Sequence, residues 1–257
     1  MTGYPTGTGL RSATRFHADA VGTDDALVWT GNRNKLRSTI PLIYCHGLSH
    51  TAAEAQWRAN AQGGDDFRPI AGWGHPIILT DLGGISTWGN DTALAALNGA
   101  IAWAHSTYGT RDDLVAVGGE SMGALLAMEW AWLHPTSCAA VWLRVPCIDL
   151  QYAHDTNALF ASTIDSAYTN HAGYLAQLAN RSPILNIARL RAVRDRMRIW
   201  AATDDEFFPL ADTRRFAHDV GCRFDTIVGN HEDALDTPAG ETARWLHKTI
   251  TATDRFL

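Results

Sequence analysis

Short apolar runs, rich in β-branched residues, alternate along the chain with longer stretches in which apolar positions repeat every three or four residues. The short runs are typical of buried strands and the longer stretches of helices, so the alternation favours a mostly parallel sheet flanked by helices. The first two runs are too close together for an intervening helix, and we expect them to form an antiparallel hairpin. The expected strands lie within eight segments: 13–21, 25–32, 39–47, 75–81, 112–119, 138–146, 197–205 and 224–228.

Several expected helices have recognisable ends. Asn90 or Asp91 caps a run with apolar residues at helical spacing, and Gly109 follows this run as a C-terminal stop. A second helix is expected to begin at Ser121, and a last one to cover about 240–250. These helices fit between the expected strands, as crossover connections of a parallel sheet require.

The alternation is interrupted once, by about 50 residues between the sixth and seventh expected strands. A structureless loop of this length is improbable in a compact domain, and the segments 158–180 and 184–197 have helical patterns. We therefore predict a helical cap at 148–196, inserted after strand 6 into an α/β core formed by residues 1–147 and 197–257.

Composition and charge narrow the function classes. The chain has 257 residues, of which 46% are hydrophobic and 19% charged, which is enough to bury a sizeable core. Its net charge of −6 argues against a partner such as nucleic acid or an anionic membrane, because both need a basic surface. Five arginines near the end of the expected cap are predicted to form a solvated face, with an anionic-substrate or envelope-facing patch as the alternative: Arg181, Arg189, Arg191, Arg194 and Arg196.

No apolar run approaches the roughly 20 residues of a membrane span, and the N-terminal segment lacks the pattern of a secretory signal. A cytoplasmic protein is therefore expected, with a virion-associated or non-classically exported one as the alternative. The four cysteines are scattered, so free thiols are expected, and a Cys138–Cys147 bridge is the main exception. His46 and His50 are four residues apart but lack an accompanying HExxH or carboxylate cluster, so we expect no metal and no cofactor.

One serine lies at a turn with unusual constraints. The stretch VAVGGESMGALLAM runs from an apolar strand into a helix and places Ser121 between Gly119 and Gly123. A turn this tight strains the serine backbone, and glycine two residues to each side relieves the crowding. The hydroxyl is then exposed at the carboxyl edge of the sheet, where open α/β sheets bind ligands. An ordinary strand–helix turn is the alternative interpretation.

A serine hydroxyl needs a base to act as a nucleophile. Among the histidines after Ser121, His231 follows the last expected strand in a short loop, which brings it to the same edge of the sheet. His218 and His247 fall on expected helices, where solvent-facing or capping roles are favoured. We therefore expect His231 to be the base.

The base needs an acid that holds its tautomer, in the chain order serine, acid, histidine. Asp205 follows the seventh expected strand and is the first choice. Asp204 is the runner-up, because one residue of register decides which side chain faces inward. Asp149, just after the sixth expected strand, is a third possibility.

An oxyanion intermediate needs two backbone N–H donors. One is expected from Met122, after the serine, and the other from Leu48, just after the His-Gly pair of the third strand. Four side chains in neighbouring loops are candidates for substrate binding: His50, Trp88, Phe207 and Phe208. Core packing is an equal alternative for the two phenylalanines.

Taken together, these motifs resemble the α/β-hydrolase superfamily over nearly the whole chain, from the His46-Gly47 turn through GxSxG to the acid turn at 204–209 and the histidine at 231. The segment 81–91 is similar to actinobacterial and phage-borne esterase-like members. The resemblance implies an α/β-hydrolase fold with an eight-stranded sheet, a triad of Ser121, Asp205 and His231, and an oxyanion hole at Leu48 and Met122.

The leading hypothesis is a serine hydrolase that cleaves carboxylic esters through an acyl-enzyme. The ten tryptophans and the apolar composition suggest an uncharged, moderately hydrophobic substrate, either a small-molecule or a lipid-like ester. Two alternatives stay open. One is an acyltransferase or perhydrolase with the same triad, and the other is a non-catalytic binding or structural module of a phage or cell-envelope assembly.

Overall fold

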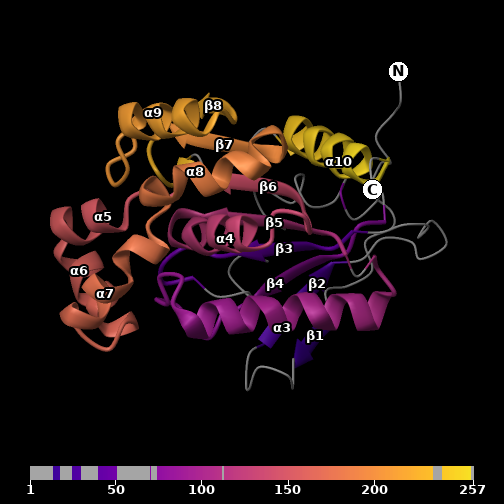
Figure 1. Cartoon of the computed structure of the whole chain (residues 1–257), viewed down its shortest axis with the longest axis horizontal. Helices are drawn as coiled ribbons and strands as arrows, with labels where there is room; N and C mark the ends of the chain where they lie inside the picture. The colour runs from indigo at the N-terminus through magenta and orange to yellow at the C-terminus, as the bar shows by residue number, and fades with distance from the viewer. Residues whose placement is uncertain are drawn as a thin grey trace.

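A computed structural model of the chain describes residues 14–17, 25–29, 40–50, 70, 74–111, 113–233 and 239–255. It has a central sheet with helices on both faces (Figure 1). The strands are β1 (Thr14–His17), β2 (Asp25–Trp29), β3 (Leu42–Cys45), β4 (Ile77–Thr80), β5 (Val115–Glu120), β6 (Cys138–Arg144), β7 (Met197–Ala202) and β8 (Arg223–Ile227). Each overlaps one of the eight expected segments, although β5 ends one residue after its segment and β8 begins one residue before its own.

The eight strands form one sheet in the order β1-β2-β4-β3-β5-β6-β7-β8. β2 pairs antiparallel with both β1 and β4, while the six strands from β4 to β8 are paired in parallel. The expected antiparallel hairpin and mostly parallel sheet are therefore confirmed. From β3, the chain adds β4 on one side of the sheet and β5 to β8 on the other. The carboxyl ends of β3 and β5 therefore flank the point where the strand order reverses, which is where open α/β sheets bind ligands.

The helices follow the strands in the expected alternation. They are α3 (Asp91–Tyr108), α4 (Ser121–Leu133), α5 (Leu150–Thr156), α6 (Ala158–Ala167), α7 (His171–Arg181), α8 (Ile187–Leu190), α9 (Leu210–Val220) and α10 (Ala239–Arg255), with 3-10 turns η3 (Pro183–Asn186) and η4 (Arg191–Arg196). The cap of α3 matches the prediction, since the Asn90 side chain accepts a hydrogen bond from the Ala93 N–H and Gly109 is left-handed.

Alternate residues of each central strand face opposite helical layers. Ile43 and Cys45 of β3 belong to a core cluster with α3, α4, α8 and α9, whereas Leu42 and Tyr44 belong to a cluster with α10. This is the period-two pattern of a sheet buried on both faces. The sheet is therefore a rigid platform from which the loops at its carboxyl edge project.

Residues 148–196 are largely helical, as expected, but both helical segments predicted there are broken. The segment 184–197 is divided among η3, α8 and η4. The segment 158–180 divides into α6 and α7 because Thr169 is left-handed, with φ 75°, and Asn170 caps α7. Figure 1 shows α5, α6 and α7 grouped at one end of the sheet, away from α10. The later part of the segment packs against the sheet, since Leu190 and Val193 lie in the main core cluster. The division into core and cap remains a prediction.

A further apolar cluster lies between α5–α7 and the loops at the sheet edge. It includes Met122 of α4, Phe160 of α6 and Phe208 after β7. All four cysteines are free thiols, and burial raises the pKa of each, that of Cys138 and Cys222 to about 12. Within the described residues, none of the helices has the length and apolar character needed to span a membrane.

Candidate functional site

The turn from β5 into α4 has the strained geometry that the sequence predicts. Ser121 is left-handed, with φ 49°, a conformation that non-glycine residues rarely adopt. A Cβ at Gly119 would lie 2.6 Å from the Gly123 carbonyl oxygen, and one at Gly123 would lie 2.3 Å from that of His46. Only glycine fits at these two positions, because both contacts are with backbone. Ser121 thus begins α4, where the helix dipole favours developing negative charge.

Asp205 and His231 form a buried pair in the loops after β7 and β8. His231 Nδ1 lies 3.0 Å from each carboxylate oxygen of Asp205, and the two side chains are only 4% and 1% exposed. The Asp205 Oδ1 atom also accepts hydrogen bonds from the backbone N–H groups of Phe207 and Phe208, each at 2.9 Å. These contacts fix the carboxylate and assign the Nδ1 proton of the imidazole, which leaves Nε2 to act as a base.

The two loops are also tied together by backbone contacts. The His231 N–H donates to Glu206 Oε2 at 3.0 Å, and the Asp204 N–H donates to the Gly229 carbonyl at 2.9 Å. These bonds hold the histidine loop against the acid loop. Because the position of the imidazole depends on both loops, Glu206 supports the pair although the sequence analysis did not single it out.

The other two acids considered for the triad lie elsewhere. Asp204 is exposed and accepts a hydrogen bond from the Thr203 hydroxyl at 2.9 Å. Asp149 caps α5, where its side chain accepts from the backbone N–H groups of Gln151 and Tyr152. Among these three acids, Asp205 is the one that pairs with His231, from the loop that follows the end of β7 at Ala202.

The loop after β3 contains the expected second oxyanion donor. Ser49 N–H donates to the Ile85 carbonyl, His50 N–H to the Gly47 carbonyl, and Gly47 N–H to the Glu120 carboxylate. The Leu48 N–H is the one in this turn with no acceptor among the described residues. Met122 is the second residue of α4, where first-turn N–H groups lack an acceptor within the helix. Both expected donors are therefore available to a ligand.

Glu120 connects this loop to the serine turn. It is only 2% exposed, and its Oε1 atom accepts from the Gly47 N–H at 3.2 Å and lies 3.3 Å from His50 Nδ1. Its Oε2 atom accepts from the Tyr44 hydroxyl at 2.7 Å. Arg144 in turn donates to the Tyr44 oxygen, at 2.6 Å from one guanidinium nitrogen. A buried chain of charge-assisted hydrogen bonds thus fixes the loop that carries Leu48 beside Ser121.

Ser121 and His231 line one cavity of about 160 Å³. The two side chains form no hydrogen bond with each other in this structure. Of the expected substrate-binding residues, His50 and Phe207 line this cavity. The remaining lining residues are Gly47, Leu48, Glu120, Phe160 and Glu232.

The other two expected substrate-binding residues lie beside the cavity. Trp88 is 1% exposed, donates from its indole nitrogen to the Thr163 hydroxyl at 3.0 Å, and packs against Phe160. It therefore ties the loop before α3 to α6. Phe208 lies edge-on to the His231 ring, with 5.6 Å between ring centroids, and thus packs against the candidate base.

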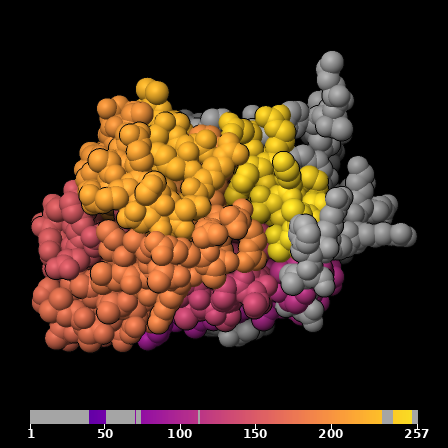
Figure 2. All heavy atoms as spheres, turned by 45° about the horizontal axis from the view of Figure 1, so that its top comes forward, coloured from indigo at the N-terminus to yellow at the C-terminus, as the bar shows by residue number. Residues whose placement is uncertain are grey.

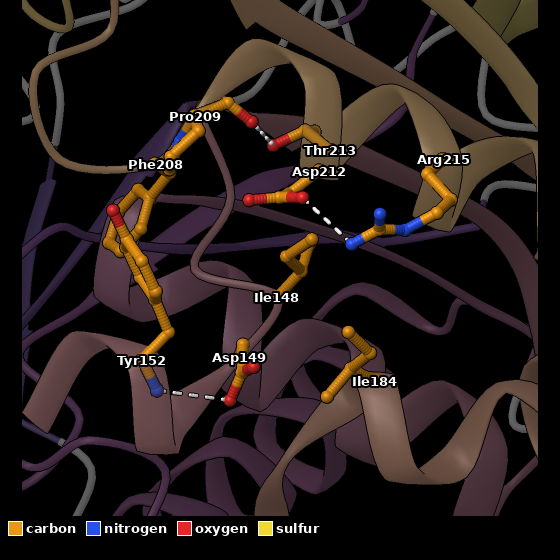
Figure 3. A pocket seen from close by; sticks show the side chains of 9 residues that line it. All are labelled: Ile148, Asp149, Tyr152, Ile184, Phe208, Pro209, Asp212, Thr213 and Arg215. Carbon is orange, nitrogen blue, oxygen red and sulfur yellow. Dashed lines mark hydrogen bonds and ion pairs between the residues drawn. The ribbon is translucent and has the colours of Figure 1, made fainter. Parts of the chain in front are cut away.

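Phe208 also borders a second cavity of about 230 Å³, seen in Figure 3. In that view, Asp149 and Tyr152 approach from α5, while Asp212 and Arg215 come from α9 and form an ion pair. This space is larger than the Ser121 cavity, but neither Ser121 nor His231 lines it. We therefore place the candidate active site at the smaller cavity.

The expected solvated face is confirmed for part of the arginine cluster: Arg189, Arg191 and Arg194 are exposed, whereas Arg181 and Arg196 are not. Arg181 is buried and pairs with Glu129 of α4 and Asp91 of α3, while its guanidinium also donates to the Gly89 carbonyl at 3.2 Å. Arg196 donates to the carbonyls of Cys138 and Pro135. These arginines join α7 and η4 to the core, because each guanidinium offers several donors to groups on different elements.

Comparison with known proteins gives structural matches only. No family model and no curated protein matches the sequence. FphF, a fluorophosphonate-binding serine hydrolase of Staphylococcus aureus solved with substrate, superposes with a TM-score of 0.71 at 13% identity, over 95% of this chain and 99% of that one. The Pyrococcus furiosus esterase Pf2001 gives 0.61 at 13% identity, over 94% and 91%. Carboxyl esterase 2 of Tuber melanosporum gives 0.63 at 15% identity, over 98% and 89%.

These structural similarities cover almost the whole of each chain, but the sequence identities are too low to assign the activity of these proteins to this chain. They agree with the parallel pairing of the strands from β4 to β8. The chain therefore has the α/β-hydrolase fold that the sequence motifs indicate.

Proposed function

We propose that the protein is a serine hydrolase that cleaves carboxylic esters through an acyl-enzyme, with Ser121 as nucleophile, His231 as base and Asp205 as the acid. The observation that carries the proposal is the geometry of one cavity. Its wall contains a serine in a left-handed turn and a histidine whose Nδ1 is held by a buried carboxylate. Mutual placement of nucleophile, base and acid is the recognised signature of this chemistry.

In the proposed mechanism, His231 Nε2 removes the Ser121 proton as Oγ attacks the ester carbonyl carbon. This step needs the two atoms to approach within about 2.6–3.2 Å, which substrate binding would bring about. The oxyanion then accepts from the Leu48 and Met122 N–H groups. The alcohol leaves with the proton from His231, and a water activated by the same imidazole hydrolyses the acyl-enzyme.

The lining of the cavity favours a small, neutral ester. Its volume of about 160 Å³ is well below the range of about 300–1,000 Å³ typical of drug-sized ligands. Leu48, Phe160 and Phe207 offer apolar surface, and the described lining residues include two glutamates but neither lysine nor arginine. A short acyl chain without a carboxylate fits this surface best. Phe160 belongs to the predicted cap, which would then border the substrate.

The proposal is tested by measuring hydrolysis of p-nitrophenyl butyrate by the wild type, Ser121→Ala and His231→Ala. Each variant should lose at least about a thousandfold in kcat, because members of a triad act as a unit. Circular dichroism should show both variants folded. Near-native turnover in either variant would refute the role assigned to that residue, and no turnover by the wild type on any neutral ester would favour a non-catalytic module.

A further inference from the structure

Three helices at the end of the molecule bring together two histidines and a carboxylate. His154 lies in the last turn of α5, Asp165 in α6, and His171 at the first position of α7. His154 Nε2 lies 3.2 Å from Asp165 Oδ1, and His171 Nδ1 lies 3.1 Å from the same oxygen. One ligand atom from each residue can be chosen so that all three lie within 4.8 Å of one another.

These separations match a small coordination sphere. A tetrahedral zinc ion with bonds of about 2.0–2.2 Å holds its nitrogen and oxygen ligands about 3.3–3.5 Å apart. The two nitrogen–oxygen separations at Asp165 are within a few tenths of an ångström of that value. All three ligand atoms lie within 4.8 Å of one another, so side-chain rotation has to bring the two histidine nitrogens to the same spacing.

The ring nitrogen of His154 that faces away from Asp165 also has a carboxylate partner, as is usual for a metal-bound histidine. His154 Nδ1 lies 3.1 Å from an Asp155 carboxylate oxygen, so carboxylates flank both ring nitrogens. A neutral imidazole has one N–H, and if Nδ1 donates it to Asp155, the Nε2 lone pair faces Asp165. A cation between Nε2 and Asp165 would replace the repulsion between this lone pair and the carboxylate with two metal–ligand bonds. The Asp155 carboxylate on the other ring nitrogen matches the arrangement that orients histidine ligands of zinc.

The His154 ring is held in one orientation, and solvent can reach all three candidate ligands. The His154 ring stacks on Tyr174 of α7, with centroids 4.7 Å apart and an angle of 10°, which fixes the plane of the imidazole. The His154 side chain is 13% exposed, that of Asp165 33% and that of His171 54%. Figure 2 shows the segment that contains α5, α6 and α7 open to solvent at one end of the molecule. An ion can therefore enter and keep a water as its fourth ligand.

We propose that His154, Asp165 and His171 bind a divalent transition-metal ion such as zinc, which links α5, α6 and α7. Two imidazoles and one carboxylate suit zinc and its neighbours, whereas magnesium and calcium prefer oxygen ligands throughout. The carboxylates of Asp155 and Asp165 offset the charge of the ion. The expectation of no metal rests on the absence of an HExxH motif or carboxylate cluster beside His46 and His50, whereas these three residues are spread over 18 positions of three helices.

The ion is structural in this proposal and takes no part in ester cleavage. Its effect reaches the candidate active site through packing, because α6 also carries Phe160, which lines the Ser121 cavity. The proposal rests on the geometry of these helices alone and does not depend on the function proposed above.

The test is zinc titration of the full chain, without an affinity tag and after removal of metal with a chelator, by calorimetry and by thermal unfolding. We expect one zinc per chain and a rise in Tm that the chelator reverses. His154→Ala and His171→Ala should weaken zinc binding at least tenfold and abolish the rise in Tm, and Asp155→Asn should weaken it about 10–100-fold. The Tm of each variant in chelator shows whether it folds.

His218→Ala is the matched control, because the exposed His218 pairs with its neighbour Asp219 at 3.2 Å as His154 pairs with Asp155, but lies in no cluster of three ligands among the described residues. It should bind zinc like the wild type. Absence of a stoichiometric zinc site in the wild type would overturn the proposal. Binding that is as tight in His171→Ala as in the wild type would also overturn it.

Discussion

Asp205 contacts the imidazole of His231 with both carboxylate oxygens at 3.0 Å, while its neighbour Asp204 is exposed and accepts from Thr203. Both residues follow β7, which ends at Ala202, and in the loop there Asp205 faces the imidazole while Asp204 faces solvent. The two carboxylates are therefore a natural pair for testing which one acts on the histidine.

Asp205→Asn should lower kcat for ester hydrolysis by about 10⁴-fold, because an amide in this place holds the imidazole in the wrong tautomer. Asp204→Asn should change kcat less than about threefold. Steady-state kinetics on p-nitrophenyl butyrate provide the comparison. A larger loss in the Asp204 variant would transfer the acid role to that residue.

Glu120→Gln should lower kcat by about 10–100-fold with little change in KM. The carboxylate holds the Gly47 N–H and thereby the loop that presents Leu48 to the oxyanion, so the loss should stay below the 10²–10³-fold cost of deleting an oxyanion donor outright. Because this role is one of positioning, the split between kcat and KM is the informative readout.

Glu232→Gln is the control for Glu120, since Glu232 also lines the cavity but is exposed. Its kcat should stay within about threefold of the wild type. If Glu120→Gln lowered only the Tm and left kcat unchanged, the carboxylate would be part of the fold and not of the active site.

Arg181→Met should destabilise the protein by about 3–5 kcal/mol at pH 8, because it leaves the Glu129 carboxylate buried without its partner. Urea unfolding measures this loss. Arg215→Met, which removes an exposed pair with Asp212, should cost at most about 1 kcal/mol.

The cost of Arg181→Met should depend on pH. Burial raises the pKa of Glu129 from 4.5 to about 7, and the attraction of Arg181 opposes that rise. A carboxyl whose folded pKa exceeds its unfolded pKa loses stability as the pH rises between the two values, and no penalty remains below the unfolded one. Without Arg181 this penalty grows, so the variant should lose clearly less at pH 5 than at pH 8. Equal losses at the two pH values would contradict this account of Glu129.

The cavity predicts a preference for short acyl chains. The kcat/KM for p-nitrophenyl acetate or butyrate should exceed that for the decanoate by at least about tenfold, because the space beside Ser121 is only about 160 Å³. Phe160→Ala should reduce this ratio by opening the α6 wall. Leu159→Ala, an exposed position on the same helix, should leave it unchanged. A wild type that hydrolyses the decanoate best would contradict the assignment of this cavity to the acyl group.

Much of the fold was predictable because the strands β3 to β7 are compact, buried and mostly apolar runs, and several helices have local end signals. Asn90 and Gly109 mark the ends of α3 in sequence as they do in space. The break between α6 and α7 was missed because the helical spacing of apolar residues continues across Thr169, although Asn170 is a typical capping residue. Local pattern therefore predicted the elements better than the boundaries inside the helical segment.

The site was predictable where chemistry imposes a local motif, and not where partners come from distant strands. Gly119 and Gly123 reveal the serine turn because backbone crowding admits no other residue. Glu120 stands inside the same motif at a position that the turn leaves free, and its partners are Tyr44 and Gly47, more than 70 residues away. Arg181 was misread for the same reason, since the acids that bury it belong to α3 and α4.

The central claim is that the histidine and aspartate activate Ser121, and labelling with a fluorophosphonate probe tests it most directly. After brief exposure of the wild type, Ser121→Ala and His231→Ala, intact mass and peptide mapping locate and time the adduct. The account predicts one adduct on Ser121 of the wild type, none on Ser121→Ala, and much slower labelling of His231→Ala. An unlabelled wild type, or an adduct that forms equally fast without His231, would contradict it.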